Sequence, residues 1–224
     1  MGLRHCRWSA FRVTPIAARM LVVVVGFRAA GKTRMVNELK KSKTCAFDHV
    51  MDADDFYGTD LRVLEVDSSA AMFRAFVPNM RKFCDAHAQE NVILFGQFID
   101  SDHYSIPAGA DAYLFLDVPC AVAAERNLTR QLKAWHDNSH ELFELLTRKG
   151  SRGCLQYLNE SLSPHVLAYD AQHLWEAAAE LGSFKLITPE QLKTWATTPN
   201  ATVADLPSNL QPLRRAFKRP RTDQ

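Results

Sequence analysis

Five short apolar runs divide the chain, and longer amphipathic segments lie between them. In the longer segments apolar residues recur at every third or fourth position, which is typical of helices packed on a core. Short apolar strands that alternate with helices are typical of a parallel sheet covered by helices on both faces. We therefore predict an α/β fold with five parallel strands at residues 21–25, 45–51, 91–95, 112–116 and 184–187.

Helices are predicted in the segments between these strands. The longest has one apolar stripe, made of Met, Phe, Val and Cys side chains at helical spacing. The last helix begins after Thr188, whose side chain suits an N-cap, and has proline at its first position. The expected helices cover residues 32–41, 69–90, 121–135, 141–149, 151–161, 164–181 and 189–195.

A glycine-rich loop joins the first strand to the first helix. It reads Gly26-Phe27-Arg28-Ala29-Ala30-Gly31-Lys32-Thr33. Its glycines allow the backbone to curl until successive N–H groups face one anion-sized hollow, and the following helix adds its positive end. Lys32 can reach the β- and γ-phosphates of a nucleotide, and the Thr33 hydroxyl can ligate Mg²⁺. The strand–loop–helix setting predicts a phosphate-binding loop for ATP formed by these eight residues, the alternative being a turn that binds nothing.

Three carboxylates follow the second strand, at Asp52, Asp54 and Asp55, and the aromatic residues Phe56 and Tyr57 come next. One interpretation is a polar loop with a helix cap, because aspartate favours caps. The other is catalytic: a phosphotransferase needs one carboxylate to hold Mg²⁺ and another to take a proton from the attacking hydroxyl. The neighbouring phosphate loop favours the catalytic interpretation.

Two arginines follow the fourth strand on one helical face, Arg126 and Arg130. They could be exposed side chains that pair with Glu125 or with solvent. They could also form a lid whose guanidinium groups bind the transferring phosphates. Because ligands of open α/β sheets bind at the carboxyl ends of the strands, their position favours the lid.

The formal net charge of +2 gives no global electrostatic reason to expect nucleic acid as a partner. Five scattered cysteines indicate reduced thiols, and the apolar runs are too short to cross a membrane. Residues 1–19 carry arginine but no acid, which fits a disordered extension, an upstream start before Met20 or an organelle transit peptide. Residues 197–224 read as a proline-rich, basic, disordered tail that could contact nucleic acid or direct nuclear import.

The motifs together resemble the uridine kinase, nicotinamide riboside kinase and pantothenate kinase group of P-loop small-molecule kinases. The resemblance covers about residues 20–187 and implies the nucleoside-monophosphate-kinase fold with a helical lid. The domain would then span residues 20–196, and a cytoplasmic location is expected, with mitochondrial or nuclear alternatives through the basic ends.

The resemblance also implies roles for individual residues. Asp54 matches a carboxylate that acts as base or as a Mg²⁺-linked acid, and Phe56 and Tyr57 match aromatics on the substrate side. Arg126 and Arg130 match lid arginines. Less securely, Arg148 and Arg152 match a second basic stretch of the lid.

One position departs from the group, which usually carries Glu-Gly at the end of the third strand. The pair here is Phe95-Gly96, and Gln97 or Asp100 could substitute for the acid. We expect an ATP- and Mg²⁺-dependent kinase that uses Lys32, Asp54, Arg126 and Arg130 on a small acceptor hydroxyl. Gln97 is expected to contact that acceptor. The missing acid keeps open a nucleotide-binding switch or scaffold without transfer activity.

Overall fold

The computed structural model describes residues 19–56, 69–100, 103–104, 106–137, 143–144, 146–147, 150–152 and 164–213. Tyr57 and Arg148, together with residues 1–18 and 214–224, lie outside these ranges. Within them no helix is long and apolar enough to cross a membrane.

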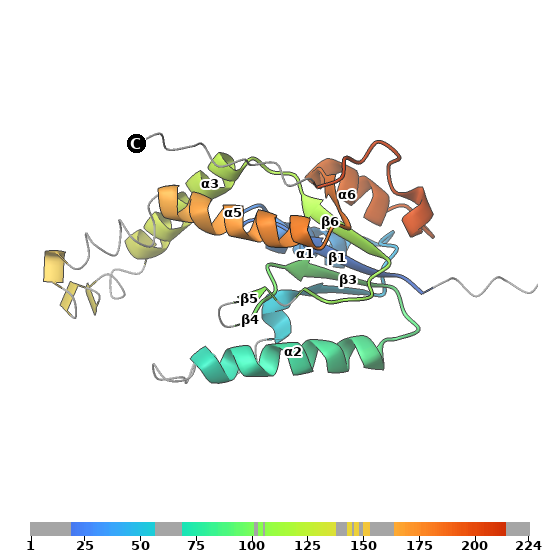
Figure 1. Ribbon diagram of the computed structural model, residues 1–224, viewed down its shortest axis with the longest axis horizontal. Helices are drawn as coiled ribbons and strands as arrows, with labels where there is room; N and C mark the ends of the chain where they lie inside the picture. The colour runs from blue at the N-terminus through green and yellow to red at the C-terminus, as the bar shows by residue number, and fades with distance from the viewer. Residues whose placement is uncertain are drawn as a thin grey trace, which may run out of the picture.

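Five parallel strands form the central sheet, in the order β2-β3-β1-β6-β7 (Figure 1). They are β1 (Leu21–Val25), β2 (His49–Asp52), β3 (Val92–Gly96), β6 (Ala112–Leu116) and β7 (Phe184–Ile187). Each side chain of β1 and β3 is buried, as expected for strands covered on both faces. The predicted α/β fold with five parallel strands is confirmed.

The helices are α1 (Lys32–Lys41), α2 (Ser69–Ala86), α3 (Cys120–Asp137), α5 (Pro164–Glu180) and α6 (Pro189–Ala196). From β1 the chain runs through α1 to β2, so it crosses the sheet past the position of β3. It then runs through α2 back to β3, in the opposite direction. Because such crossovers are right-handed, α1 and α2 lie on opposite faces of the sheet. Figure 1 shows α3 and α5 packed side by side. The chain passes from β6 to β7 through these helices in the same direction as from β2 to β3 through α2, so the same rule places them on the face that α2 covers.

Short elements complete the fold. The 3₁₀ turn η1 (Ala53–Phe56) follows β2, the strands β4 (Ile99–Asp100) and β5 (His103–Tyr104) form a small antiparallel pair, and the turn η3 (Val203–Asp205) follows α6. The second strand begins at His49 rather than at residue 45, because pairing with β3 begins there. The capped start of α6 is confirmed: Thr188 and Gln191 form a reciprocal capping box.

The segment 197–213 packs against the end of the sheet. Leu186 donates a backbone hydrogen bond of 2.7 Å to the Gln211 carbonyl, and Leu213 donates one of 2.8 Å to the Phe184 carbonyl. Leu213 and Ala201 are buried in the core. The prediction of a disordered tail from residue 197 is therefore wrong for residues 197–213, where apolar side chains secure the segment.

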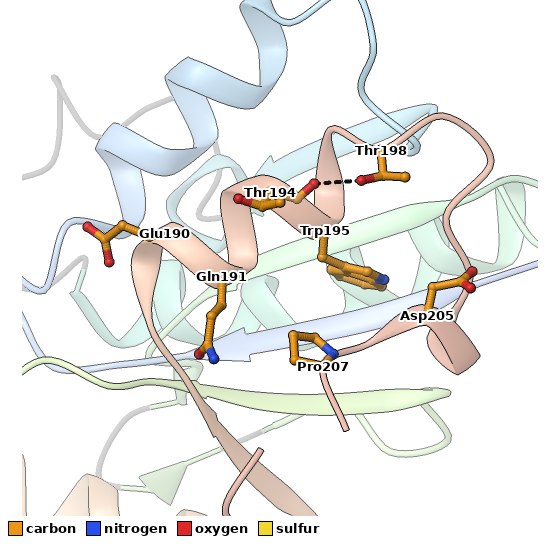
Figure 2. Close-up of a pocket in the computed structure, with 7 residues that line it drawn as sticks. All are labelled: Glu190, Gln191, Thr194, Trp195, Thr198, Asp205 and Pro207. Carbon is orange, nitrogen blue, oxygen red and sulfur yellow. Dashed lines mark hydrogen bonds between the residues drawn. The ribbon is translucent and has the colours of Figure 1, made fainter. Parts of the chain in front are cut away.

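A pocket of about 370 Å³ lies between α6 and this segment (Figure 2). The Trp195 indole in its wall donates a hydrogen bond of 2.9 Å to the Thr202 carbonyl, and the Thr198 hydroxyl donates one of 2.8 Å to the Thr194 carbonyl. These lining groups therefore serve the packing of the segment. The pocket is lined by Glu190, Gln191, Thr194, Trp195, Thr198, Asp205 and Pro207.

Candidate phosphate-binding site

The glycine-rich loop leads from the buried end of β1 into the first turn of α1. Ala30 donates a backbone hydrogen bond of 3.1 Å to the Phe27 carbonyl, which closes a turn inside the loop. Ala29 (φ 57°) and Gly31 (φ 96°) adopt the left-handed conformation. Glycine adopts it without penalty, whereas Ala29 does so at a steric cost. The loop is therefore folded tightly back on itself.

The N-terminus of α1 carries features that favour an anion. Gly31 occupies the N-cap position and offers no side-chain oxygen to the first N–H groups, and the first turn contains no acid. In α6, by contrast, the equivalent N–H groups are satisfied by Thr188 and Gln191. The N–H groups without a side-chain cap and the positive end of the helix dipole are features that suit the binding of a phosphate group at this helix start.

Lys32 lies beneath this loop. Its Nζ donates hydrogen bonds of 2.6 Å to the Gly26 carbonyl and 2.7 Å to the Phe27 carbonyl. Burial lowers the pKa of Lys32 to about 8, although the carboxylates of Asp52 and Asp54 raise it. A half-buried ammonium whose hydrogen bonds go to neutral carbonyls keeps its positive charge available to an incoming phosphate.

The carboxylates after β2 face the same loop. The Thr33 hydroxyl donates a hydrogen bond of 2.9 Å to Asp52 Oδ2, which connects α1 with the end of β2. The Asp54 backbone N–H donates a longer bond of 3.3 Å to Asp52 Oδ1. Asp55 Oδ2 accepts a hydrogen bond of 3.3 Å from the Asp52 backbone N–H and pairs with Lys40 at 3.6 Å. The hydroxyl of Thr33 and the carboxylate of Asp52 are hard oxygen donors that fit Mg²⁺.

Asp54 differs from its neighbours in its surroundings. Loss of solvent raises the pKa of this carboxyl, and the nearby charge of Asp52 raises it further, while Lys32 and Arg130 act in the opposite direction. A carboxylate with a raised pKa accepts a proton more readily than an ordinary surface aspartate. Asp54 is therefore suited to proton transfer beside the loop.

Of the two exposed arginines Arg126 and Arg130 on α3, Arg130 acts electrostatically on the residues beside the loop. Its charge lowers the pKa of both Lys32 and Asp54, and its guanidinium donates a hydrogen bond of 2.9 Å to Asn127 Oδ1. Arg126 is exposed one helical turn earlier on α3. Among the described residues, only Arg130 of this pair acts on the pKa of Lys32.

Gln97 follows the end of β3 and reaches the loop from that side. Its Oε1 accepts a hydrogen bond of 3.4 Å from Arg28 Nε. The preceding residue, Gly96, leaves space for the neighbouring η1 turn, since a Cβ built on it would lie 2.3 Å from the Ala53 Cβ. Phe95, which stands where the resembled kinases have an acid, is fully buried in the core.

Phe56 is not a substrate contact. Its side chain is 5% exposed and packs on Phe76 and Phe83 of α2, with ring centroids 6.4 and 5.4 Å away. Its ring thus contributes to the core. Of the remaining predicted residues, Arg152 is exposed and Tyr57 and Arg148 lie outside the described ranges.

The hydrogen bond between Thr33 and Asp52 was not predicted from the sequence. The signal that could have found it is the place of Asp52 at the carboxyl end of a strand beside the phosphate loop, where ligands of such sheets bind. The predicted second strand ended at residue 51, so Asp52 was grouped with the acids of the following loop, whereas β2 includes Asp52.

Together the buried strand, tight loop, uncapped helix and lysine have the arrangement that the sequence predicts for a phosphate-binding loop. The chain has the P-loop NTPase fold. Its strand order has β1 in the centre and β3 between β1 and β2. The loop after β1 and Asp52 at the end of β2 therefore both lie at the carboxyl ends of the parallel strands.

No protein-family profile matches the sequence, and no curated protein matches it. Several solved structures are similar in shape. The shikimate kinase from Bacteroides thetaiotaomicron has a TM-score of 0.41 and 13% identity over 77% of this chain and 88% of that chain. The gluconokinase from Sinorhizobium meliloti 1021 has a TM-score of 0.39 and 14% identity over 81% of this chain and 88% of that chain.

A third similar structure is the deoxyadenosine kinase from M. mycoides with bound dATP. Its TM-score is 0.38, with 12% identity over 76% of this chain and 92% of that chain. Because these identities and TM-scores are low, neither the fold nor the chemistry of this chain rests on them.

Proposed function

We propose that this protein is a kinase that transfers the γ-phosphoryl group of ATP to a hydroxyl group of a small metabolite, with Mg²⁺. The observation that carries the proposal is the uncapped start of α1, with Lys32 beneath it and Thr33 hydrogen-bonded to Asp52. A nucleoside-like acceptor is the first candidate, because the motifs resemble those of the uridine kinase group.

In this proposal the loop holds the nucleotide. Backbone N–H groups at the start of α1 and the Lys32 ammonium bind the β- and γ-phosphates. Thr33 and Asp52 hold Mg²⁺, directly or through its water, because their oxygens already lie 2.9 Å apart. When bound, Mg²⁺ neutralises the phosphate charge that the transfer develops.

Asp54 takes the proton of the acceptor hydroxyl. It lies on η1, two residues beyond the metal-binding Asp52, and its raised pKa suits a base. Arg130 neutralises the charge of the transferring group, since its guanidinium already acts electrostatically on Lys32 and Asp54. Gln97 contacts the acceptor side, and Arg126 adds charge at the rim of the lid.

The test is acceptor-dependent release of ADP from ATP and Mg²⁺, measured against a panel of nucleosides, vitamins and sugars. Lys32→Ala should lose both nucleotide binding and turnover. Asp54→Asn should lose turnover while ATP binding survives, because asparagine cannot accept the proton. Turnover retained by Asp54→Asn would move the role of the base to another carboxylate.

A second candidate function is a nucleotide-binding switch or scaffold without phosphoryl transfer. Phe95 favours this candidate, because it stands where the resembled kinases carry an acid and is buried in the core. ATP binding that requires Lys32, with no acceptor-dependent release of ADP and no phosphorylated product, would support the switch and contradict the kinase.

A further inference from the structure

A second group of metal-ligand side chains lies at the opposite end of β2 from the phosphate loop. His49 is the first residue of β2, and His87 and Glu90 follow the end of α2. Three residue steps along the strand, about 10 Å, separate His49 from Asp52. The group is therefore distinct from the proposed Mg²⁺ site.

Two imidazoles converge on one carboxylate oxygen. His49 Nε2 and His87 Nδ1 both contact Glu90 Oε2, the latter at 3.1 Å. One donor atom from each residue falls within 4.8 Å of the other two. A tetrahedral Zn²⁺ with bonds of 2.0–2.1 Å separates its ligand atoms by about 3.3 Å, so small movements of these side chains would create the geometry.

The backbone around the group is held in place. The N–H groups of Asp48 and His49 donate hydrogen bonds of 2.9 and 3.1 Å to the Asn91 carbonyl, and the Asn91 N–H donates one of 2.8 Å to Asp48 Oδ2. The Glu90 N–H donates one of 3.0 Å to the His87 carbonyl. These bonds join the segment before β2 to the segment before β3.

The aromatic ring of Phe83 orients both imidazoles. Its centroid lies 5.5 Å from that of His49, at an interplanar angle of 89°, and 4.5 Å from that of His87. The side chains of His49 and His87 are 26% and 29% exposed, so they are packed on one side and open on the other. Ligands that are fixed in this way lose little freedom when a metal binds.

We propose that His49, His87 and Glu90 bind a divalent transition metal of the zinc type. Imidazole nitrogen suits Zn²⁺ and its first-row neighbours, whereas Mg²⁺ and Ca²⁺ prefer sets made of oxygen. Three protein ligands leave one coordination position for water. The metal fastens the start of β2 to the end of α2, and this role is independent of the proposed kinase activity.

The test is titration of the full, metal-stripped chain with Zn²⁺ by calorimetry, with saturating Mg²⁺ and a reductant that contains no thiol and does not chelate the metal. Wild-type protein should bind one equivalent through this group. His87→Ala and Glu90→Gln should each weaken that binding at least about tenfold, because each removes one of three ligands. Co²⁺ should give the visible absorption of a four-coordinate site in wild type and lose it in both variants.

The matched control is His173→Ala. His173 lies 3.7 Å from Glu176 on α5, at the same three-residue spacing as His87 and Glu90, and its substitution should leave Zn²⁺ binding unchanged. Circular dichroism verifies folding, and Glu90→Gln, which keeps the size of the side chain, decides the result if His87→Ala does not fold. Equal Zn²⁺ affinity in wild type and Glu90→Gln, or no saturable equivalent in wild type, would overturn the proposal.

Discussion

The hydroxyl of Thr33 donates a hydrogen bond of 2.9 Å to Asp52 Oδ2. This bond joins the first turn of α1 to the last residue of β2, so two oxygen donors from separate elements meet beside the phosphate loop. A cation that binds Thr33 would find the carboxylate already in place. Of the three acids, Asp52 is the one whose carboxylate accepts the Thr33 hydrogen bond, so substitution of single acids can separate their roles.

Asp52→Asn should raise the Mg²⁺ concentration needed for half-maximal activity and lower kcat by about a hundredfold, because asparagine keeps an oxygen but loses the charge. Binding of ATP without Mg²⁺ should persist. Asp55→Asn is the matched control, since asparagine keeps an oxygen that can accept the hydrogen bond from the Asp52 N–H and loses only the charge that pairs with Lys40, and it should change little. Steady-state kinetics across a Mg²⁺ series measure both. Equal effects of the two substitutions would remove Asp52 from the metal site.

Nucleotide affinity should weaken as the pH rises above the Lys32 pKa of about 8. Burial lowers this pKa in the free protein, and bound phosphate raises it again, so ATP binding takes up a proton between the two values. Below pH 8 the Lys32 ammonium is charged in both the free and the bound state, so the affinity for ATP changes little with pH there. Calorimetry in buffers of different ionisation enthalpy between pH 7.5 and 9.5 measures the uptake, and Lys32→Met should abolish it.

The same pKa has a consequence for folding. The unfolded chain keeps the proton of Lys32 up to its ordinary pKa of 10.5, whereas the folded protein releases it near 8. Between these pH values the unfolded state binds more protons, so the contribution of Lys32 to stability increases with pH in this window and is least favourable below it.

Arg130→Ala should lower kcat by about a hundredfold, as expected for one charged donor to the transition state, with a smaller change in the affinity for ATP. The Arg130 guanidinium is held by Asn127, a buried polar residue, through a hydrogen bond of 2.9 Å. Arg126→Ala, one turn away on the same helix, provides the comparison and should have the smaller effect. A larger loss in Arg126→Ala would assign the lid role to that residue instead.

Gly96→Ala should destabilise the fold by about 2 kcal/mol or more, because small-to-large changes in a packed site force the backbone to move. The new Cβ would lie 2.3 Å from the Ala53 Cβ. Ala53→Gly removes that atom, so the double variant should recover part of the loss. Urea unfolding of both single variants and the double variant completes the cycle. If the losses of unfolding free energy in the two single variants simply add up in the double variant, the contact with the Ala53 Cβ is not the cause of the destabilisation.

The sequence predicts those parts of the site whose geometry depends on adjacent residues. The loop from Gly26 to Thr33, the start of α1 and the capped start of α6 all follow from local residue types. Phe56 shows the limit. In a 3₁₀ turn, residues three apart share a face, so Phe56 is buried on the side of Ala53. The position of an aromatic residue after two aspartates does not reveal that turn.

Contacts between distant segments could not be predicted in this way. His49 lies about forty positions from His87 and Glu90 in the chain, and only the pairing of β2 with β3 brings them together. The segment after α6 did contain a signal. Its prolines suggested a tail, but Ala201 and Leu213 are buried, and Leu206 and Leu210 pack against the core.

The backbone of residues 211–213 closes one side of the sheet. Through its bonds to Phe184 and Leu186, this segment covers β7, the outermost strand in the order. An uncovered outer strand presents a row of free N–H and C=O groups on which another molecule can add a strand. Proline at 212, which lacks an N–H, also makes the segment a poor template for further pairing. These residues therefore leave fewer free groups on β7 to which another strand could pair.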